Sequence, residues 1–524
     1  MDVSLTPLEF ARRARRIYPH REAVVDGARR FTYAQFFERC DRWSRALQDM
    51  GVRAGDRVVV IAPNTHRLLE QFYAVPQIGA IVVPLNYRLT ATDFRYMIEH
   101  CEPTVVCVHE DFIGTLEGMR GELAGVRHFV ALSGAAAAGW VDYEHALAAA
   151  SPQFAPPLIA EGDVIAINYT SGTTSRPKGV MITHRNAWMN SVGTLIHHPM
   201  AVGERYLWTL PMFHANGWTF VWTVTAAGGT HVCLAKVDAS AVYALVNREQ
   251  VSMLCAAPTV LIAIANGPAA ERAGVRGGVR VLTAGAAPAA ATIKRIEGEL
   301  GWVVTHVYGL TETAPFILVC EPRPRDAQAT ADESASHKAR QGVELITSGE
   351  LRVLDHEDAE VPADGATLGE IVVRGNVVMQ GYYKDPQATA AALKDGWFHT
   401  GDAAVVHPDG YVEIRDRFKD VIISGGENIS SIELEGVLLL HPAVLEAAVV
   451  GMAHEKWGET PVAHVVLRAG AQATAEQLRA HCRDQLAGFK VPSAVHFVAE
   501  LPKTATGKIQ KYVLRKQHSA IHRQ

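Results

Sequence analysis

Residues 169–179 combine the residue types that bind phosphate groups. The stretch reads YTSGTTSRPKG and holds five serines and threonines, two glycines and Lys178. Glycine and hydroxyl side chains let a backbone approach phosphate closely and donate N–H and O–H groups, and the lysine adds positive charge. The P-loop pattern GxxxxGK[ST] is absent. On composition alone, a phosphate-binding loop and a polar surface loop that caps a helix are equally good interpretations.

The elements that would position this stretch follow an alternating pattern. Short, nearly continuous apolar runs predict buried parallel strands at 57–62, 80–85, 104–109, 164–169, 251–256, 279–284 and 303–307. Helical periodicity is expected at 65–78, at 92–100 and from about residue 183. Repeated β–α alternation predicts an α/β fold with mostly parallel sheets. The phosphate-type stretch would then lie between a strand and a helix.

The pattern changes after about residue 345. Short strands at close spacing are expected at 350–354, 370–374 and 410–414. Beyond them, helices are expected at 431–440 and 475–486, and strands at 446–450 and 463–467. A single hydrophobic core rarely exceeds about 250–300 residues. We therefore expect an α/β protein with a large N-terminal domain of layered α/β subdomains and a small α+β domain, with bounds 1–416 (about 345–416 being a β-rich subdomain) and 417–524.

Composition excludes several classes of protein. Fifty basic and 55 acidic residues give a net charge of −5, which argues against a dedicated nucleic-acid binder. Seven cysteines without a CxxC pair predict buried thiols of a reducing compartment. The longest largely apolar stretch, Met253–Ala265, contains Pro258 and is shorter than the roughly 20 residues of a membrane span. No signal peptide is recognised. We expect a cytoplasmic protein without a transmembrane segment.

Five motifs, in order, resemble those of the adenylate-forming (AMP-binding) superfamily, which includes acyl-CoA synthetases and fatty-acid–CoA ligases. The 169–179 stretch resembles its phosphate loop, and Tyr308–Thr313 (YGLTET) its adenine and magnesium motif. Gly396–Asp402 (GWFHTGD) resembles the ribose motif, Arg415–Asp420 (RDRFKD) the hinge, and Pro502–Ile509 (PKTATGKI) the motif with the catalytic lysine. The resemblance covers nearly the whole chain. It implies that the small C-terminal domain is a mobile lid.

The resemblance also implies which residues bind the nucleotide. They are Thr170, Ser171, Gly172, Thr173, Thr174 and Lys178 for the phosphates, Gly285, Ala286, Ala287 and Tyr308 for adenine, Gly309 and Thr311 beside them, and Asp402 and Arg417 for the ribose. Thr170 and Glu312 would lie near Mg²⁺, because carboxylate and hydroxyl oxygens suit a hard cation. Without the resemblance, Asp402 is more simply a turn residue after Gly401.

Three residues are implied in catalysis. Lys508 would bridge the negative charge that develops when a carboxylate attacks the α-phosphorus; taken alone, it is a solvated surface lysine. Glu312 would act through the metal. His214, in PMFHANGW, would lie beside the acyl carboxylate, although a lone histidine is more often structural.

Further residues are assigned to the acyl pocket and to the thiol step. Trp218 and Ala314 would line the acyl pocket. The spacing of Trp218, Phe220 and Trp222 equally predicts one face of a core strand. Lys419 corresponds to the hinge. Gly425, Gly426 and Glu427 would face the active site during thiol transfer, or form a Gly-Gly turn, or both.

The leading hypothesis is an ATP-dependent carboxylic acid–CoA ligase of fatty-acid (lipid) metabolism. It would form acyl-AMP and pyrophosphate, then acyl-CoA and AMP, with ATP, Mg²⁺ and CoA. The strings HANGW and WTLPMF are most similar to the short- and medium-chain branch. Alternatives are an aryl- or long-chain acyl-CoA ligase, a stand-alone adenylating enzyme that loads a carrier protein, and a non-catalytic nucleotide-binding scaffold. The expected partners are small molecules, with no nucleic acid; a homodimer stays open.

Overall fold

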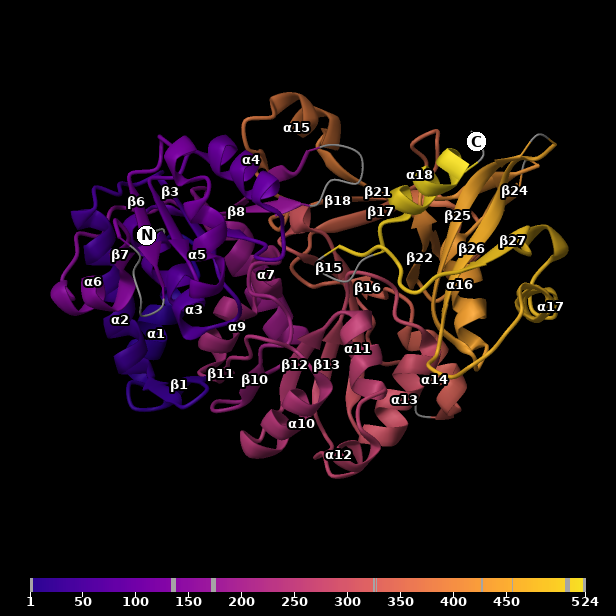
Figure 1. Cartoon of the computed structure of the whole chain (residues 1–524), viewed down its shortest axis with the longest axis horizontal. Coiled ribbons are helices and arrows are strands. Elements are labelled where there is room, and N and C mark those ends of the chain that lie inside the picture. Colours follow the sequence, from indigo (N-terminus) through magenta and orange to yellow (C-terminus); the bar gives the residue numbers. More distant parts are fainter. Residues whose placement is uncertain are drawn as a thin grey trace.

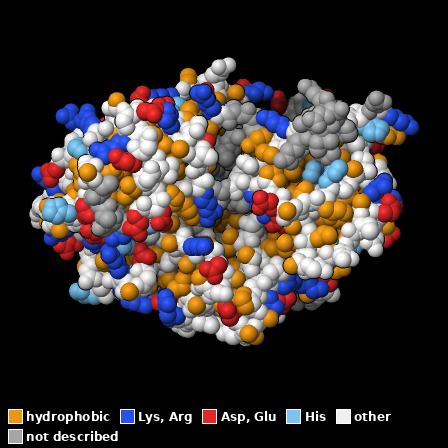
Figure 2. Space-filling view, in the orientation of Figure 1, with side chains coloured by type: hydrophobic (Ala, Val, Ile, Leu, Met, Phe, Trp, Pro, Cys, Tyr) orange, Lys and Arg blue, Asp and Glu red, His pale blue; other side chains and the backbone are white. Residues whose placement is uncertain are grey.

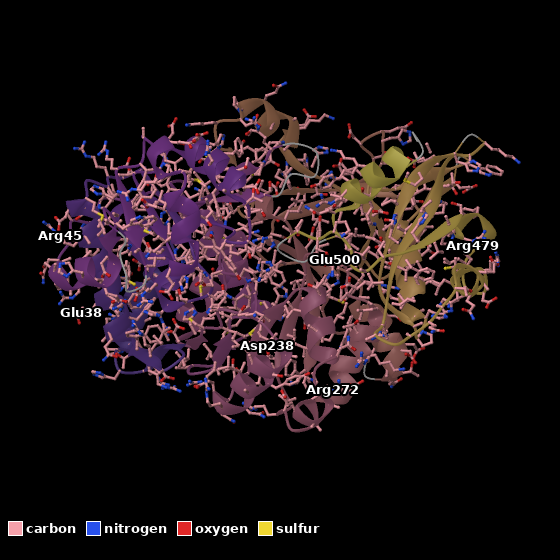
Figure 3. All side chains as sticks on the ribbon, viewed as in Figure 1. Glu38, Arg45, Asp238, Arg272, Arg479 and Glu500 are labelled. Carbon is pink, nitrogen blue, oxygen red and sulfur yellow. The ribbon has the colours of Figure 1, made fainter. Side chains whose placement is uncertain are left out.

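The computed structural model describes residues 3–132, 138–170, 176–323, 326, 328–425, 427–454, 456–504 and 509–521. Figure 1 shows an elongated molecule in which the N-terminal elements and the C-terminal elements lie at opposite ends of the long axis. Figure 3 gives the same impression, because Glu38 and Arg45 of α2 (Tyr33–Asp49) lie at one end and Arg479 of α17 (Ala475–Arg483) at the other. On the face shown in Figure 2, acidic and basic side chains are interspersed, in keeping with the balanced composition.

The first large sheet carries the predicted phosphate motif. Its order is β19 (Gly381–Tyr382), β9 (Lys178–Thr183), β8 (Val164–Thr170), β4 (Ile81–Leu85), β3 (Arg57–Ile61), β5 (Val105–Val108), β6 (His128–Ala131) and β7 (Val141–Asp142). From β8 to β7 neighbouring strands are parallel, whereas β8–β9 and β9–β19 are antiparallel. The four strands predicted in this half of the chain are confirmed.

The second large sheet carries the predicted adenine motif. Its order is β16 (Val343–Glu344), β15 (Phe316–Val319), β14 (Val303–Gly309), β13 (Arg280–Thr283), β12 (Met253–Ala256), β10 (Arg205–Leu207), β11 (Thr230–Val232), β1 (Glu22–Asp26) and β2 (Arg29–Thr32). The strands from β14 to β1 are parallel, and antiparallel strands close both edges. The predicted mostly parallel α/β sheets are thus confirmed.

Helices connect and cover these sheets. They are α1 (Leu8–Ile17), α2, α3 (His66–Ala74), α4 (Ala91–Cys101), α5 (Glu110–Glu117), α6 (Tyr143–Ala149), α7 (His184–His197), α8 (Ala215–Trp218), α9 (Phe220–Ala227), α10 (Ala239–Arg248), α11 (Pro258–Ala265), α12 (Ala269–Ala273), α13 (Ala290–Leu300), α14 (Ala331–Lys338) and α15 (Pro386–Ala392), with short 3₁₀ turns η1 (Pro76–Ile78), η2 (Arg120–Glu122) and η3 (Thr311–Thr313). The largest hydrophobic core includes side chains from both sheets, and Phe72 of α3 meets Trp222 of α9 within it.

The predicted β-rich subdomain is an antiparallel sheet of β17 (Glu350–Leu354), β18 (Gly369–Arg374), β21 (Trp397–Val406), β20 (Leu393–Lys394) and β22 (Val412–Arg417). The last strand was expected at 410–414 and instead begins and ends later. It follows that Arg417 belongs to a strand of this sheet.

The C-terminal unit contains β23 (Ile422–Ser424), β24 (Glu427–Ile429), β25 (Val444–His454), β26 (Gly458–Leu467), β27 (Ala494–Phe497), α16 (Ser431–Leu440), α17, the 3₁₀ turn η5 (Gly488–Lys490) and α18 (Lys511–Ile521). Its sheet is mixed, because β27 runs parallel to β26 while the other pairs are antiparallel. The predicted class, a large α/β region and a small α+β region, is confirmed.

Two further expectations concern cysteines and membranes. All seven cysteines are buried free thiols, as predicted. None of the described helices is both long and apolar enough to cross a bilayer.

Candidate active site

The phosphate motif lies at the turn between two antiparallel strands. Tyr169 of β8 pairs with Gly179 of β9, and Thr170 pairs with Lys178. Helix α7 begins at His184 with Thr183 as its cap, as predicted. Strand β9, however, was not predicted: its first two residues belong to the predicted loop, and its last residue is the expected start of the helix. The predicted Ser171, Gly172, Thr173 and Thr174 lie outside the described residues.

A tyrosine connects Lys178 with Glu312. The Lys178 ammonium lies 4.7 Å from the centre of the Tyr382 ring, and the Tyr382 hydroxyl donates to Glu312 Oε1 at 2.9 Å. Tyr382 reaches both because β19 pairs with β9, and because the Met379 amide donates to the Glu312 carbonyl at 2.8 Å. Sequence reasoning did not find Tyr382; its signal was the Gly-Tyr-Tyr run at 381–383.

Burial controls the charge state of Glu312. It raises the pKa of the carboxyl group, and the hydrogen bond from Tyr382 opposes that shift. Tyr382 therefore favours the ionised carboxylate, the form that binds a cation. The donor set suits Mg²⁺, since carboxylate and hydroxyl oxygens are the ligands that this ion takes from proteins.

A second cluster joins three predicted residues from the adenine, ribose and hinge motifs. The Tyr308 hydroxyl donates to Asp402 Oδ2 at 2.6 Å, and Arg417 Nε lies 3.2 Å from Asp402 Oδ1. Asp402 and Arg417 face each other across β21 and β22. Burial, together with the negative charge of Asp402, raises the pKa of Tyr308 well above its usual value. The interpretation of Asp402 as a turn residue is wrong, because the residue lies inside β21.

The two clusters are neighbours. Strand β14 carries Tyr308 and leads directly into η3, which carries Glu312. Arg417 lowers and Asp402 raises the pKa of Glu312, so all three charges act on one another. Gly309 lies between them, and a Cβ atom there would approach the Pro315 carbonyl oxygen to 1.8 Å, which excludes any other residue.

The other predicted nucleotide residues lie along the same edge of the second sheet. Thr311 begins η3. The segment Gly285–Ala287 follows β13, the neighbour of β14, in which Thr283 pairs with His306. Gly285 and Ala286 are exposed, and Ala287 is half-buried. The carboxyl ends of parallel strands thus bring this segment and Tyr308 to one edge.

A strained turn follows His214. The Asn168 amide on β8 donates to the Phe213 carbonyl at 3.0 Å and to Asn216 Oδ1 at 3.2 Å, which attaches the turn to the strand of the phosphate motif. Residues 215–219 all have positive φ, between 37° and 65°. Left-handed backbone costs about 1–2 kcal/mol for each residue with a side chain. Such strain collects at functional sites.

Glycine is required at the centre of this turn. Gly217 has φ 54°, and a Cβ atom would lie 2.5 Å from the Trp208 ring. The interpretation of residues 218–222 as a core strand is wrong, because they belong to α8 and α9. Phe220 and Trp222 are fully buried in the core.

Trp218 lies close to the segment that contains Ala314, another residue predicted in the acyl pocket. Its ring meets the Phe316 ring edge-on, with 5.6 Å between the centroids. Ala314, two residues before Phe316, is buried and also has a positive φ of 59°. His214 caps the start of α8 and is half-buried. The structure thus brings Trp218 close to the segment that contains Ala314.

The hinge residue lies between contacts to two parts of the molecule. The Phe418 amide donates to the Gly401 carbonyl at 3.1 Å in the β-rich subdomain, whereas Asp420 pairs with Arg515 of α18 at 2.5 Å. Lys419, which is exposed, separates these contacts.

The other C-terminal predictions are only partly described. Gly425 and Glu427 are exposed, and Gly425 has φ 62°, with the Trp457 ring 2.9 Å from where a Cβ atom would lie. Gly426 and Lys508 lie outside the described residues.

Two large, mostly parallel sheets, a β-rich subdomain and a small α+β unit, with these motifs in this order, form the architecture of the adenylate-forming enzymes. A model of the AMP-binding enzyme family matches residues 10–383, and a model of the AMP-binding enzyme C-terminal domain matches residues 433–508. The chain belongs to the AMP-binding enzyme family, as predicted.

Relatives over the full length agree with this placement. The chain is 42% identical to an acetate–CoA ligase of Humulus lupulus and 39% identical to a peroxisomal trans-cinnamate:CoA ligase of Petunia hybrida, in both cases over 98% of this chain and 94% of the relative. Its fold matches the crystal structure of ATP-bound MatB from Rhodopseudomonas palustris with a TM-score of 0.86 and 28% identity, covering 98% of this chain and 99% of that one. The predicted class of enzyme, an acid–CoA ligase, is confirmed.

Proposed function

We propose that this chain activates a short- or medium-chain fatty acid with ATP and transfers the acyl group to CoA. In the first step the carboxylate attacks the α-phosphorus of ATP and releases pyrophosphate, giving acyl-AMP. In the second step the CoA thiolate attacks the acyl carbon and releases AMP. The observation that carries the proposal is a pair of clusters: Tyr382 contacts both Lys178 and Glu312, and Asp402 contacts both Tyr308 and Arg417.

The first cluster suits the triphosphate. Lys178 offers a positive charge and Thr170, opposite it, a hydroxyl group. The Glu312 carboxylate and the Thr170 hydroxyl would hold the Mg²⁺ that accompanies ATP and neutralises charge on the phosphates. Tyr382 supports this because its hydrogen bond opposes the rise in the Glu312 pKa that burial causes. Ser171, Gly172, Thr173 and Thr174 would donate further hydrogen bonds to the same phosphates.

The second cluster suits the nucleoside. The Asp402 carboxylate would accept hydrogen bonds from the ribose hydroxyls, and the Tyr308 ring would lie against adenine, opposite Gly285–Ala287. Because Tyr308 and Arg417 already bond to Asp402, the acceptor is oriented before the nucleotide arrives. Lys508 would stabilise the charge that develops at the α-phosphate and at the acyl oxygen.

The domain arrangement that we propose is a body and a lid, with bounds expected from the sequence at 1–416 and 417–524. Because Arg417 still belongs to β22 of the body sheet, we place the break between them at Lys419. The contacts on each side of Lys419 support this residue as the hinge. Rotation about it would exchange Lys508 for the segment that contains Gly425, Gly426 and Glu427, beside which CoA would pass.

The strained turn supports a limit on the size of the acid. The edge-on pair of Trp218 and Phe316, with His214 at the start of the turn, would border the acid and limit its length. The relatives named for acetate and trans-cinnamate act on acids of different size, and a short or medium aliphatic acid lies within that range.

The compartment that we propose is the cytoplasm. Seven buried, unpaired cysteines suit a reducing environment. Since the Petunia relative is peroxisomal, fluorescence of a tagged chain in its own cell should be compared with a cytoplasmic and, where present, a peroxisomal marker. Light scattering of the purified chain decides between monomer and homodimer.

A panel of carboxylic acids, assayed for pyrophosphate and AMP release with and without CoA, tests the function. We expect C4–C10 acids to react faster than C16, and AMP release to require CoA. Faster turnover of C16 would overturn the substrate class. Acyl transfer to the thiol of a carrier protein but not to CoA, with AMP as the leaving group, would favour the carrier-loading alternative. Lys508→Ala should abolish acyl-AMP formation while pre-formed acyl-AMP still reacts with CoA; undiminished adenylation would contradict its role.

A further inference from the structure

Helix α4 packs against the sheet that carries the phosphate motif. It begins with a reciprocal cap between Thr90 and Asp93. At its end, Arg57 donates to the carbonyls of Cys101 and Glu102, both at 2.7 Å. Its buried face, Phe94, Met97, Ile98 and Cys101, packs into a hydrophobic core with β3, β4 and β5. The position of the helix is therefore fixed against the sheet that carries β8 and β9.

Two residues on successive turns of α4 reach the two sides of the motif. Tyr96 and His100 are four residues apart, and their rings stack with centroids 5.7 Å apart. The Tyr96 hydroxyl donates to the Pro177 carbonyl at 3.2 Å. His100 Nδ1 lies 2.7 Å from the Tyr169 hydroxyl.

These contacts adjoin the two described residues that we assign to the triphosphate. Tyr169 precedes Thr170, and Pro177 precedes Lys178. Thr170 and Lys178 are partners across β8 and β9. Helix α4 thus makes hydrogen bonds to the residues that directly precede Thr170 and Lys178.

A cavity adjoins the attachment on the Pro177 side. A cavity of about 160 Å³ lies there, lined by Tyr96, His100, Arg176, Pro177, Lys178, Tyr383 and Asp385. The hydroxyl of Tyr96 bonds to the backbone at its border, and the Arg176 guanidinium lies 5.2 Å from the Tyr96 ring centre. The Tyr96 hydroxyl therefore holds the Pro177 carbonyl at the edge of this cavity.

The attachment on the Tyr169 side is enclosed by aromatic rings. The His100 ring meets Tyr169 and Tyr383 edge-on, at 5.8 Å and 5.7 Å. Lys384 donates to the His100 carbonyl at 3.1 Å and pairs with Glu102 at 2.9 Å. Burial and the charge of Lys384 lower the pKa of His100, so the neutral imidazole is favoured. A neutral ring with its proton on Nε2 accepts a hydrogen bond from the Tyr169 hydroxyl at Nδ1.

We propose that Tyr96 and His100 are positioning residues for MgATP, which hold Thr170 and Lys178 at the spacing that the triphosphate requires. The proposal rests on the function proposed above. Neither residue touches the reacting atoms; each acts through the backbone or the hydroxyl of a neighbour. Displacements of about 1 Å can cost about 100-fold in rate when they misplace reacting groups, so small shifts of these strand ends matter.

The test uses the purified full-length chain and three variants, Tyr96→Phe, His100→Ala and His100→Asn. We expect Tyr96→Phe and His100→Ala each to raise the KM for ATP in acid-dependent ATP–pyrophosphate exchange by about three- to tenfold, the effect of one lost hydrogen bond. The KM for the acid should stay unchanged. The rate at which pre-formed acyl-AMP reacts with CoA should also stay unchanged. His100→Asn places an amide near the position of Nδ1 and should recover much of the loss.

Tyr411→Phe is the matched control. The Tyr411 hydroxyl also donates to a backbone carbonyl, that of Glu321 at 2.9 Å, and an arginine, Arg323, also lies over its ring at 5.4 Å. It should lose similar thermal stability without a change in the KM for ATP. The proposal is overturned if Tyr96→Phe behaves like Tyr411→Phe, or if both half-reactions fall together.

Failure of the proposed function can be distinguished from failure of the positioning role. A wild-type chain without acid-dependent exchange would contradict the function, and calorimetric titration with MgATP would then test the positioning role alone. Weaker MgATP binding by Tyr96→Phe than by Tyr411→Phe supports the role, and equal binding overturns it.

Discussion

The two sides of the candidate site, which we propose bind the nucleotide and the acyl group, are organised by different forces. On the nucleotide side, Tyr308, Asp402 and Arg417 are linked by hydrogen bonds and charge. On the acyl side, a turn of left-handed residues places Trp218 against Phe316, and the contact is apolar.

The difference follows from what each side must recognise. A nucleotide presents hydroxyl groups and phosphates at fixed positions, and directional hydrogen bonds recognise such an arrangement specifically. An alkyl chain presents only length and width, and a pocket distinguishes it by space, at about 1–3 kcal/mol per methylene. We therefore expect polar variants to change ATP kinetics, and apolar or backbone variants to change the choice of acid.

The largest effect should come from Asp402→Asn. The amide would direct an N–H group at one of two donors, Tyr308 or Arg417, and would leave the half-buried Arg417 guanidinium without its carboxylate partner. We expect kcat/KM for ATP to fall about 300-fold, roughly 3.4 kcal/mol, with little change in the choice of acid. Steady-state kinetics at varied ATP measures this.

Asp409→Asn is a matched control, because Asp409 accepts a hydrogen bond from Arg323 at 2.6 Å in the turn between β21 and β22. An equal fall in kcat/KM in both variants would show that Asp402 matters only for stability of this sheet.

The next effect should come from Gly217→Ala, which tests the strained turn. The new Cβ atom would overlap the Trp208 ring at an already unfavourable φ, and we expect the free energy of unfolding to fall by about 2–3 kcal/mol. Chemical denaturation measures this. The KM for the acid should also rise, since His214 begins the turn.

Gly228→Ala provides the comparison, since Gly228 has φ 70° and a Cβ atom there would lie 2.5 Å from the Tyr18 ring, away from the site. It should lose comparable stability without a change in the KM for the acid. If both variants affect that KM alike, the turn has no specific part in acid binding.

The nucleotide side could be predicted from sequence much better than the acyl side. Tyr308, Asp402 and Arg417 each belong to a short contiguous motif, so the resemblance of those motifs to a known family was enough to select them. Their mutual contacts were not predictable, because they depend on how β14 and β21, about 90 residues apart along the chain, approach one another. Tyr382 was missed for the same reason.

On the acyl side, the backbone conformation was predicted wrongly. Alternation of Trp218, Phe220 and Trp222 indicates a strand when periodicity is the only guide. The observed chain is left-handed at 215–219 and then helical. Contacts distant in sequence, such as that of Asn168 with the Phe213 carbonyl, hold this conformation, and local propensity does not contain them.

A smaller effect is expected from Trp218→Ala, which tests whether the apolar contact limits the acid. Removing the indole would open space beside Phe316, and we expect the ratio of kcat/KM for octanoate to that for butyrate to rise about tenfold. Because both acids are measured on one variant, any loss of stability cancels from the ratio. An unchanged ratio, with both rates lowered equally, would place Trp218 in the core and not in the pocket.

The smallest effect, and the most specific, should come from Tyr382→Phe. The phenyl ring can still lie against Lys178, but Glu312 loses the hydroxyl that lowers its pKa against the effect of burial. Adenylation needs the ionised carboxylate, so activity is lost as pH falls through the pKa of Glu312. The variant raises that pKa, and the acid limb of kcat/KM for ATP should therefore move to higher pH, with about a three- to fivefold loss near neutrality.

The reaction of pre-formed acyl-AMP with CoA should keep its pH profile, because the carboxylate has no part in it. An acid limb that coincides with that of the wild type would show that the hydroxyl positions nothing on the nucleotide side, and the contrast with the acyl side would then rest on Asp402 alone.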